Sequence, residues 1–166
     1  MKKTDRTTVF SILGLLTGML IFQSCPEHEY YWYIDNNSSD TLSVYIAFAF
    51  CPTVYPDTVM SDDMTFGGYI SPGTKAPVRP TLLDWKQTLK ELPKDTLSVY
   101  IISTDTMWHY TWQEIKENYK VLVRYDLGVP DIEKLLDNNG FPTIPYPPDE
   151  RMKDIKMYPP YGTYSE

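Results

Sequence analysis

The residues best equipped for chemistry gather in one short stretch, "MWHYTW" at residues 107–112, around one of the two histidines of the chain. His109 could act as a general base if a nucleophile and an orienting acid lay within hydrogen-bond reach. Ser103, Thr104 and Asp105 are near in sequence, but no G-x-S-x-G pattern surrounds them. We therefore expect no catalytic residue and no enzyme, and hydrolysis by paired carboxylates is the least favoured function.

The aromatic residues of the same stretch favour binding over catalysis. Trp108, His109 and Trp112 could form a patch on which a sugar or a peptide stacks. Ordinary core packing is the leading interpretation of these residues, because tryptophan usually buries a large apolar area. The alternative function that follows is a weak carbohydrate- or peptide-binding protein.

Metal and cofactor signatures are absent from the sequence, which contains no C-x-x-C, H-E-x-x-H, P-loop or G-x-G-x-x-G pattern. Asp62 and Asp63 form an isolated acidic pair, which is too few ligands for a metal site. Arg124 and Asp126 lie two residues apart on a predicted strand and therefore share one face. We expect a structural ion pair there, either between these two residues or with a neighbouring side chain. For the whole chain we expect neither a metal nor a cofactor.

The N-terminus has the three parts of a secretory signal. Three basic residues within the first six are followed by an uncharged run from 7 to 24, whose apolar centre of 14 residues spans 9–22. A membrane-spanning helix needs roughly 20 apolar residues, so this run is too short to be a permanent anchor. We expect export, with residues 1–24 acting as a signal peptide.

The letters "FQSC" that end this run resemble the lipobox of bacterial lipoproteins. The resemblance implies cleavage before Cys25, lipid attachment (palmitate among the acyl chains) to its sulfur, and an envelope location. Each buried CH2 of such a lipid contributes about 0.8 kcal/mol to anchoring. The protein would then face the periplasm or lie at the surface of the outer membrane, held through its N-terminal lipid.

The mature chain would be strongly acidic. Removal of three basic residues and one acid leaves 12 basic and 21 acidic residues, a net charge of −9. Such a charge excludes nucleic acid as a partner, because affinity for nucleic acid comes mainly from neutralising phosphates. With Cys25 lipidated, Cys51 has no partner for a disulfide, and we interpret it as a small buried hydrophobe.

The remaining chain is long enough for one domain at residues 31–148, with a tether at 25–30 and a flexible Tyr/Pro-rich tail at 149–166. Strands are expected at 30–34, 41–50, 64–70, 75–80, 95–103 and 120–127, helices at 82–92, 109–119 and 129–140, and at best an edge strand at 141–148. Turn signals suggest two hairpins, one joining the first two strands and one joining the third and fourth.

These elements predict an α+β fold with a mainly antiparallel sheet and two or three short helices. The alternative is a β-sandwich with helical connections. The strongest strand signal is the alternation in "TLSVYIAFAF", which places Leu42, Val44 and Ile46 on one face and Ser43 and Tyr45 on the other.

The string "DTLSVYI" occurs twice, at 40–46 and at 95–101. Two copies with different flanks do not make a repeat architecture, and we interpret each as a strand entry. The Asp-Thr-apolar pattern also resembles the O-glycosylation signal of exported Bacteroidetes proteins. That resemblance implies glycans on some of its four threonines, which are Thr41, Thr58, Thr96 and Thr106.

Residues 112–148 resemble a family of small, uncharacterised lipoproteins of Bacteroidetes. The matching letters are W-x-E-I at 112–115, NYK-x-L-x-RYDL at 118–127 and YPP at 146–148. The resemblance implies a lipoprotein in the cell envelope and carries no catalytic role. The function expected is a lipid-anchored envelope protein that contributes structure or interaction, with a glycan or another envelope protein as its partner.

Overall fold

The computed structural model describes residues 29–48 and 58–163, which contain eight strands and four α-helices. The strands are β1 (Tyr30–Asn36), β2 (Leu42–Ala47), β3 (Met64–Ile70), β4 (Thr74–Thr81), β5 (Leu97–Ser103), β6 (Val123–Leu127), β7 (Thr143–Tyr146) and β8 (Lys156–Tyr158). The helices are α2 (Trp85–Lys90), α3 (Thr104–His109), α4 (Trp112–Glu117) and α5 (Val129–Lys134), with 3-10 turns η1 (Pro93–Asp95) and η2 (Glu150–Met152). The α+β fold class is confirmed.

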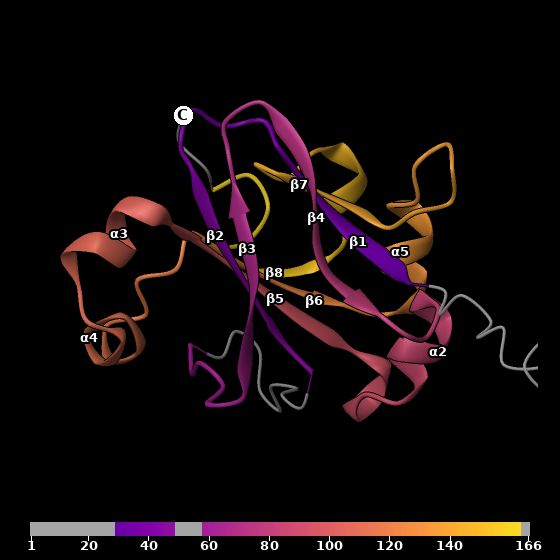
Figure 1. Ribbon diagram of the computed structural model, residues 1–166, viewed down its shortest axis with the longest axis horizontal. Coiled ribbons are helices and arrows are strands. Elements are labelled where there is room, and N and C mark those ends of the chain that lie inside the picture. The colour runs from indigo at the N-terminus through magenta and orange to yellow at the C-terminus, as the bar shows by residue number, and fades with distance from the viewer. Residues whose placement is uncertain (1–28, 49–57, 164–166) are drawn as a thin grey trace, which may run out of the picture.

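The strands form two sheets that share one core (Figure 1). The smaller sheet has the order β4-β1-β7, and the larger has the order β3-β2-β5-β6-β8. All pairings are antiparallel except that of β1 with β7. Two layers of strands are also a feature of the alternative fold, the β-sandwich.

The alternation in β2 explains how the larger sheet packs. Leu42, Val44 and Ile46 are buried in the core shared with the smaller sheet, as predicted. Tyr45 and Ala47 point to the opposite face, where a second, smaller apolar cluster forms with Ile115 of α4. Both faces of the larger sheet are therefore partly covered.

The predicted hairpin between β1 and β2 does not form, because the chain passes from one sheet to the other between these strands. Asn36 organises this corner. Its side-chain amide donates to the carbonyls of Asp40 (2.7 Å) and Ile70 (3.1 Å), and its oxygen accepts from the amide (3.0 Å) and hydroxyl (2.7 Å) of Ser38. A polar residue that is completely buried thereby fixes a change of sheet where we expected a hairpin turn.

The second predicted hairpin is also wrong. β3 pairs with β2, whereas β4 pairs with β1, so the turn at residues 71–73 again crosses between the sheets. The turn signal of Pro72-Gly73 is itself confirmed, since Gly73 has a φ of +63°. The position of a turn can therefore be predicted from its residues. The strand with which each neighbouring strand pairs cannot, because that choice depends on the core that the two sheets share.

The C-terminal segment is part of the fold, which corrects the prediction of a flexible tail. β8 pairs with β6 at the edge of the larger sheet, and Met152, Ile155 and Met157 are buried. These three apolar residues are spaced among charged ones, so the composition of the segment conceals its buried face. β7 lies at the edge of the smaller sheet, as the prolines of "FPTIPYPP" predict.

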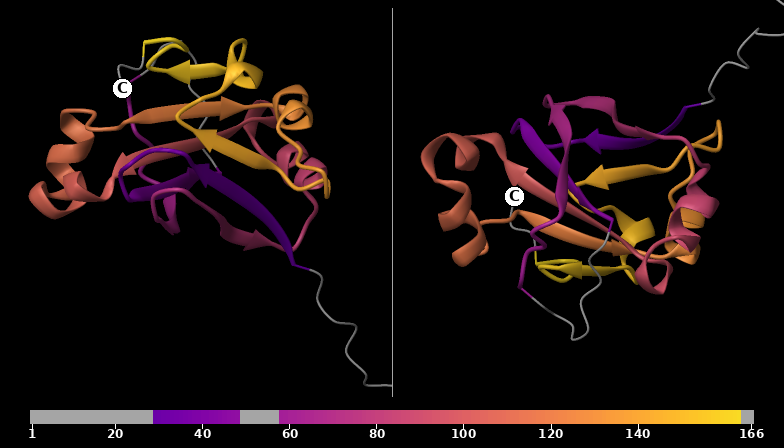
Figure 2. Two further views of the ribbon diagram at one scale, coloured as in Figure 1. Left: turned by 90° about the horizontal axis from the view of Figure 1, so that it is seen from above. Right: turned by 60° about the horizontal axis from the view of Figure 1, so that its bottom comes forward.

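The helices lie at two opposite ends of the molecule. α3 and α4 occupy one end, and α2 and α5 occupy the other, as both views of Figure 2 also show. The predicted capping box of α4 is present, with Thr111 and Glu114 exchanging hydrogen bonds. α3 was not predicted, because its six residues lack apolar residues at helical spacing.

Candidate functional site

An aromatic pocket lies at the end of the molecule that carries α2 and α5. Its cavity has a volume of about 300 Å³. Three separate segments line it, namely 30–32 at the start of β1, 84–86 at the start of α2, and 140–142 before β7. This volume is at the lower end of the range for ligand pockets, which suits a small ligand or one end of a larger ligand.

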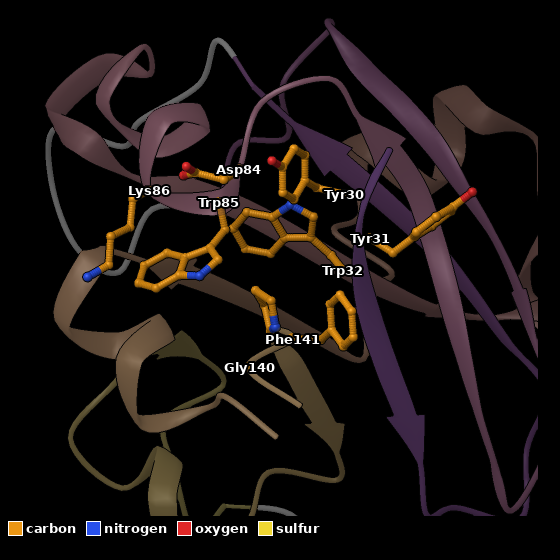
Figure 3. A pocket seen from close by; sticks show the side chains of 9 residues that line it. Tyr30, Tyr31, Trp32, Asp84, Trp85, Lys86, Gly140 and Phe141 are labelled. Atoms are coloured by element: carbon orange, nitrogen blue, oxygen red, sulfur yellow. The ribbon is translucent and has the colours of Figure 1, made fainter. Parts of the chain in front are cut away.

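Aromatic rings make up most of the pocket wall. Figure 3 shows the indole rings of Trp32 and Trp85 close to one another, with Tyr30 above them and Phe141 below them in the view. Trp32 belongs to the buried core, so its position is fixed by packing, and Trp85 packs against the same core. Phe141 is 38% exposed and contacts Tyr33 at 5.8 Å between ring centroids. The pocket is therefore a preformed apolar surface that remains accessible.

Two charged residues at the start of α2, its N-cap Asp84 and Lys86, border the aromatic wall. Asp84 caps the helix by accepting a hydrogen bond from the amide of Gln87 at 2.9 Å. Lys86 lies with its Nζ 5.0 Å from the centre of the Trp85 ring and donates to Glu133 of α5 at 3.0 Å. An acceptor and a donor thus stand beside an apolar wall, which is the arrangement that orients a ligand with both C–H faces and hydroxyl groups.

The loop that presents Phe141 is organised by Asp137. One carboxylate oxygen accepts the amides of Asn139 (2.8 Å) and Phe141 (2.9 Å), and the other accepts Lys75 Nζ at 2.6 Å. These bonds, led by that from Lys75, lower the pKa of Asp137 to about 2. The ionised carboxylate therefore holds one wall of the pocket in place.

Acid is expected to release this loop. Because the folded-state pKa of Asp137 lies below its usual value, the contribution of this group is present above about pH 4 and is lost as the pH falls toward 2. In an NMR titration, the Phe141 amide should shift with a midpoint near pH 2, and Asp137→Asn should abolish the shift. A midpoint at or above the unperturbed value of about 3.9 would contradict this role.

A second set of exposed aromatic residues, here called the aromatic row, lies on the outer face of the larger sheet. It consists of Trp112, Tyr45, Phe66 and Tyr69, whose successive ring centroids are 5.0, 5.3 and 4.8 Å apart. Phe66 and Tyr69 are 43% and 62% exposed. Contiguous exposed rings of this kind are typical of interaction surfaces.

The predicted patch of Trp108, His109 and Trp112 is divided by the structure. Trp112 joins the aromatic row through Tyr45. Trp108 is 81% exposed on α3 and joins neither aromatic surface. His109 is exposed, and its Nδ1 lies 2.8 Å from the carbonyl oxygen and 3.3 Å from the carboxylate of Asp105, both one turn earlier in α3. The structure thus brings only Trp112 of the three into an aromatic cluster.

The modification sites predicted from sequence lie in different settings. Cys25 and the residues before it fall outside the described residues, as does Cys51. Thr58 is exposed, whereas Thr41, Thr96 and Thr106 are half-buried. Thr106 lies in α3. Glycosylation stays a prediction. Thr58 is the most exposed of the four threonines, so a glycan attached there would contact the fewest neighbouring side chains.

Arg124 and Asp126 form the ion pair that the sequence indicates, and the pair is buried in the larger sheet. Both Nε and Nη2 of Arg124 lie 3.1 Å from one carboxylate oxygen, and Ser98 donates to the other at 2.7 Å. Burial raises the pKa of Asp126, and the bonds from Ser98 and Arg124 oppose that rise. Burial likewise raises the pKa of the neighbouring Tyr100 to about 12. No described pocket reaches this pair, so we assign it to the structure of the sheet.

Within the described residues, no helix is long and apolar enough to cross a membrane. The same residues contain no group of three metal-ligating His, Cys, Asp or Glu side chains. Comparison with models of protein families, with curated proteins and with solved structures found no match to this chain. The assignment of a function therefore rests on the two aromatic surfaces.

Sequence reasoning missed the pocket because its three segments are far apart along the chain. The sequence places Trp85 on the apolar face of a helix, and "YYW" at 30–32 within a strand. One signal was available, since three aromatic residues in succession place a ring on each side of a strand. Only the pairing of β1 with β4 and β7 brings α2 and Phe141 to that ring.

Proposed function

We propose that this protein is a lipid-anchored envelope protein whose domain binds a sugar in the aromatic pocket. One observation carries the proposal: a cavity of about 300 Å³ is walled by aromatic rings and bordered by one carboxylate and one ammonium group. Cys25 is the proposed site of the lipid. No catalytic role is included, because no described nucleophile, base and acid come together at this site.

A sugar ring matches the two kinds of surface in the pocket. Its C–H groups form an apolar face that can pack on Trp85 or Phe141, and its hydroxyl groups can bond Asp84 and Lys86 at the rim. An apolar peptide side chain would pack on the rings alone and would form no hydrogen bond with Asp84 or Lys86. Carbohydrate binding, the alternative function predicted from the sequence, is therefore retained. The proposed site is the pocket and not the patch around Trp108.

Replacing Trp85 by alanine is expected to weaken sugar binding at least about tenfold, since about 1.4 kcal/mol of stacking would be lost. Binding is measured by calorimetry with glucose, galactose, mannose and N-acetylglucosamine, using the lipidated protein in detergent. Trp108→Ala is the matched control, because Trp108 is an exposed tryptophan at the opposite end of the molecule. It should bind as the unaltered protein does.

Loss of binding in both the Trp85→Ala and the Trp108→Ala variant, with circular dichroism spectra unchanged, would contradict the assignment to the pocket.

A second pair of variants, which removes smaller rings, tests the same wall of the pocket. Phe141→Ala removes a pocket ring that is 38% exposed, and Phe66→Ala removes a ring of the aromatic row that is 43% exposed. Only Phe141→Ala should reduce the affinity for the sugar.

The anchor is tested by a single change. Cys25→Ala is expected to move the protein from the membrane fraction and to abolish incorporation of labelled palmitate, because the proposed lipid is attached through the Cys25 sulfur. A Cys51→Ala variant is the control and should stay in the membrane and be labelled. Membrane retention of the Cys25→Ala protein after carbonate washing would contradict the proposal that a lipid on Cys25 anchors the protein.

The aromatic row supports a second candidate function, the docking of another envelope protein. Two of its four rings, Phe66 and Tyr69, belong to β3, which is an edge strand of the larger sheet. A photo-crosslinking residue in place of Phe66 should capture one defined protein in the native host, and the same residue in place of Phe141 should not. If the residue at position 66 captures no protein, docking through the aromatic row is excluded.

A further inference from the structure

The aromatic pocket lies at the end of the domain where the chain arrives from Cys25. β1 begins at Tyr30, which is five residues after Cys25. An extended residue spans at most about 3.6 Å, so Tyr30 lies within about 18 Å of the proposed lipid attachment site. Because Tyr30, Tyr31 and Trp32 line the pocket, the pocket must lie close to any membrane that holds Cys25.

The same end exposes apolar side chains. Leu82 is 65% exposed and follows Thr81, the residue that pairs with Tyr30. Phe141 is 38% exposed and lines the pocket itself. Apolar side chains beside tryptophan and tyrosine suit the boundary between lipid headgroups and acyl chains, where one side of each ring is apolar and the other is wet.

The opposite end has no comparable link to the anchor. α3 and α4 lie at the far end of the molecule from α2 and from the start of β1 (Figures 1 and 2). Both charged and aromatic side chains are exposed at that end, among them Asp105 (81%) and Trp108 (81%), so the tether and not side-chain polarity distinguishes the two ends. A short tether therefore selects one orientation, with the pocket toward the membrane and α3 away from it.

We propose that the pocket end rests on the membrane that holds Cys25, and that the ligand is the sugar headgroup of a glycolipid in that membrane. This inference rests on the proposed function, because it needs both the lipid at Cys25 and sugar binding in the pocket. Confinement to one surface raises the effective concentration of such a headgroup at the pocket without any new contact. A soluble sugar would gain nothing from that confinement.

The orientation is tested with the lipidated full chain, labelled with 5-fluorotryptophan and reconstituted into phosphatidylethanolamine vesicles. A lipid with a nitroxide on its headgroup should broaden the ¹⁹F resonance of Trp85 and leave that of Trp108 sharp. Broadening of Trp108 equal to or greater than that of Trp85 overturns the orientation.

The source of the sugar is tested in the same vesicles without the nitroxide. One arm contains diacylglycerols that carry glucose, galactose or N-acetylglucosamine, and the other receives the methyl glycosides of these sugars in solution. The glycolipid should shift the Trp85 resonance at a bulk sugar concentration at least about tenfold lower than the methyl glycoside requires. A long Gly/Ser insertion after Pro26 should remove most of this advantage while leaving binding of the methyl glycoside unchanged.

The outcomes separate this inference from the function on which it rests. Shifts with the methyl glycoside but none with the glycolipid overturn the glycolipid inference and leave sugar binding intact. Equal concentration dependence in the two arms also overturns it. No shift in either arm overturns the proposed function and this inference together.

Discussion

Replacing Asp126 by alanine is expected to lower the free energy of unfolding by about 3–5 kcal/mol, because a buried guanidinium would lose its carboxylate partner. The carboxylate has two partners, Arg124 and Ser98, and all three residues are buried in the larger sheet. Alanine would leave the Arg124 guanidinium charged and surrounded by protein. Urea unfolding followed by circular dichroism measures the change.

The chain contains its own control for this experiment. Asp149 and Arg151 are also two residues apart and form an ion pair at 2.7 Å, but both side chains are more than 40% exposed. Asp149→Ala removes this exposed pair and the cap bond that Asp149 accepts from the amide of Arg151, and should therefore cost no more than about 2 kcal/mol. Simultaneous replacement of Arg124 and Asp126 by Met and Leu should restore most of the lost stability, because no buried charge would remain. Equal losses for Asp126→Ala and Asp149→Ala would show that the buried pair has no special role.

The second large effect is expected at the corner between the two sheets. Asn36→Asp should destabilise the protein by about 2–4 kcal/mol, because the carbonyls of Asp40 and Ile70 each lose a donor and gain a negative charge nearby. The new carboxylate would also be buried. Thermal and urea unfolding at pH 7 measure the loss, which should become smaller as the pH is lowered and the new aspartate takes up a proton.

The neighbouring residue provides the comparison. Asn37 is exposed, and its side chain makes one long bond, 3.4 Å, to the carbonyl of Asp35. Asn37→Asp makes the same chemical change one residue away and should alter stability by no more than about 0.5 kcal/mol. Comparable losses in the two variants would mean that the effect comes from added charge in an acidic protein and not from the network of Asn36.

The fold could be predicted from the sequence as far as local patterns determine it. The alternation in β2, the capping box of Thr111 and the turn at Gly73 are all visible there, and each is present. The pairing of strands could not be read in this way, because both predicted hairpins cross between sheets. Asn36 shows why: its four hydrogen bonds join residues up to 34 positions apart, and such a network leaves no periodic signal.

The candidate site was less predictable than the fold. Aromatic residues suggested binding, but the patch expected around Trp108 is not the pocket that the structure contains. Trp85 and Phe141 are more than 50 residues apart, and they meet because β1 pairs with both β4 and β7. A prediction from aromatic residues that are close in sequence favours residues 107–112. It cannot detect a pocket whose lining residues come from segments far apart along the chain.

If a sugar binds between the aromatic rings of the pocket, the four tryptophans of the chain allow this to be observed directly. Trp32 and Trp85 line the pocket, whereas Trp108 belongs to α3 and Trp112 to α4, the two helices at the other end of the molecule. The protein is labelled with 5-fluorotryptophan, each ¹⁹F resonance is assigned by a single Trp→Phe variant, and the panel of sugars is titrated. The resonances of Trp32 and Trp85 should shift together while the other two stay constant. Shifts confined to Trp108 or Trp112, or no shift with any sugar, would contradict sugar binding in the pocket.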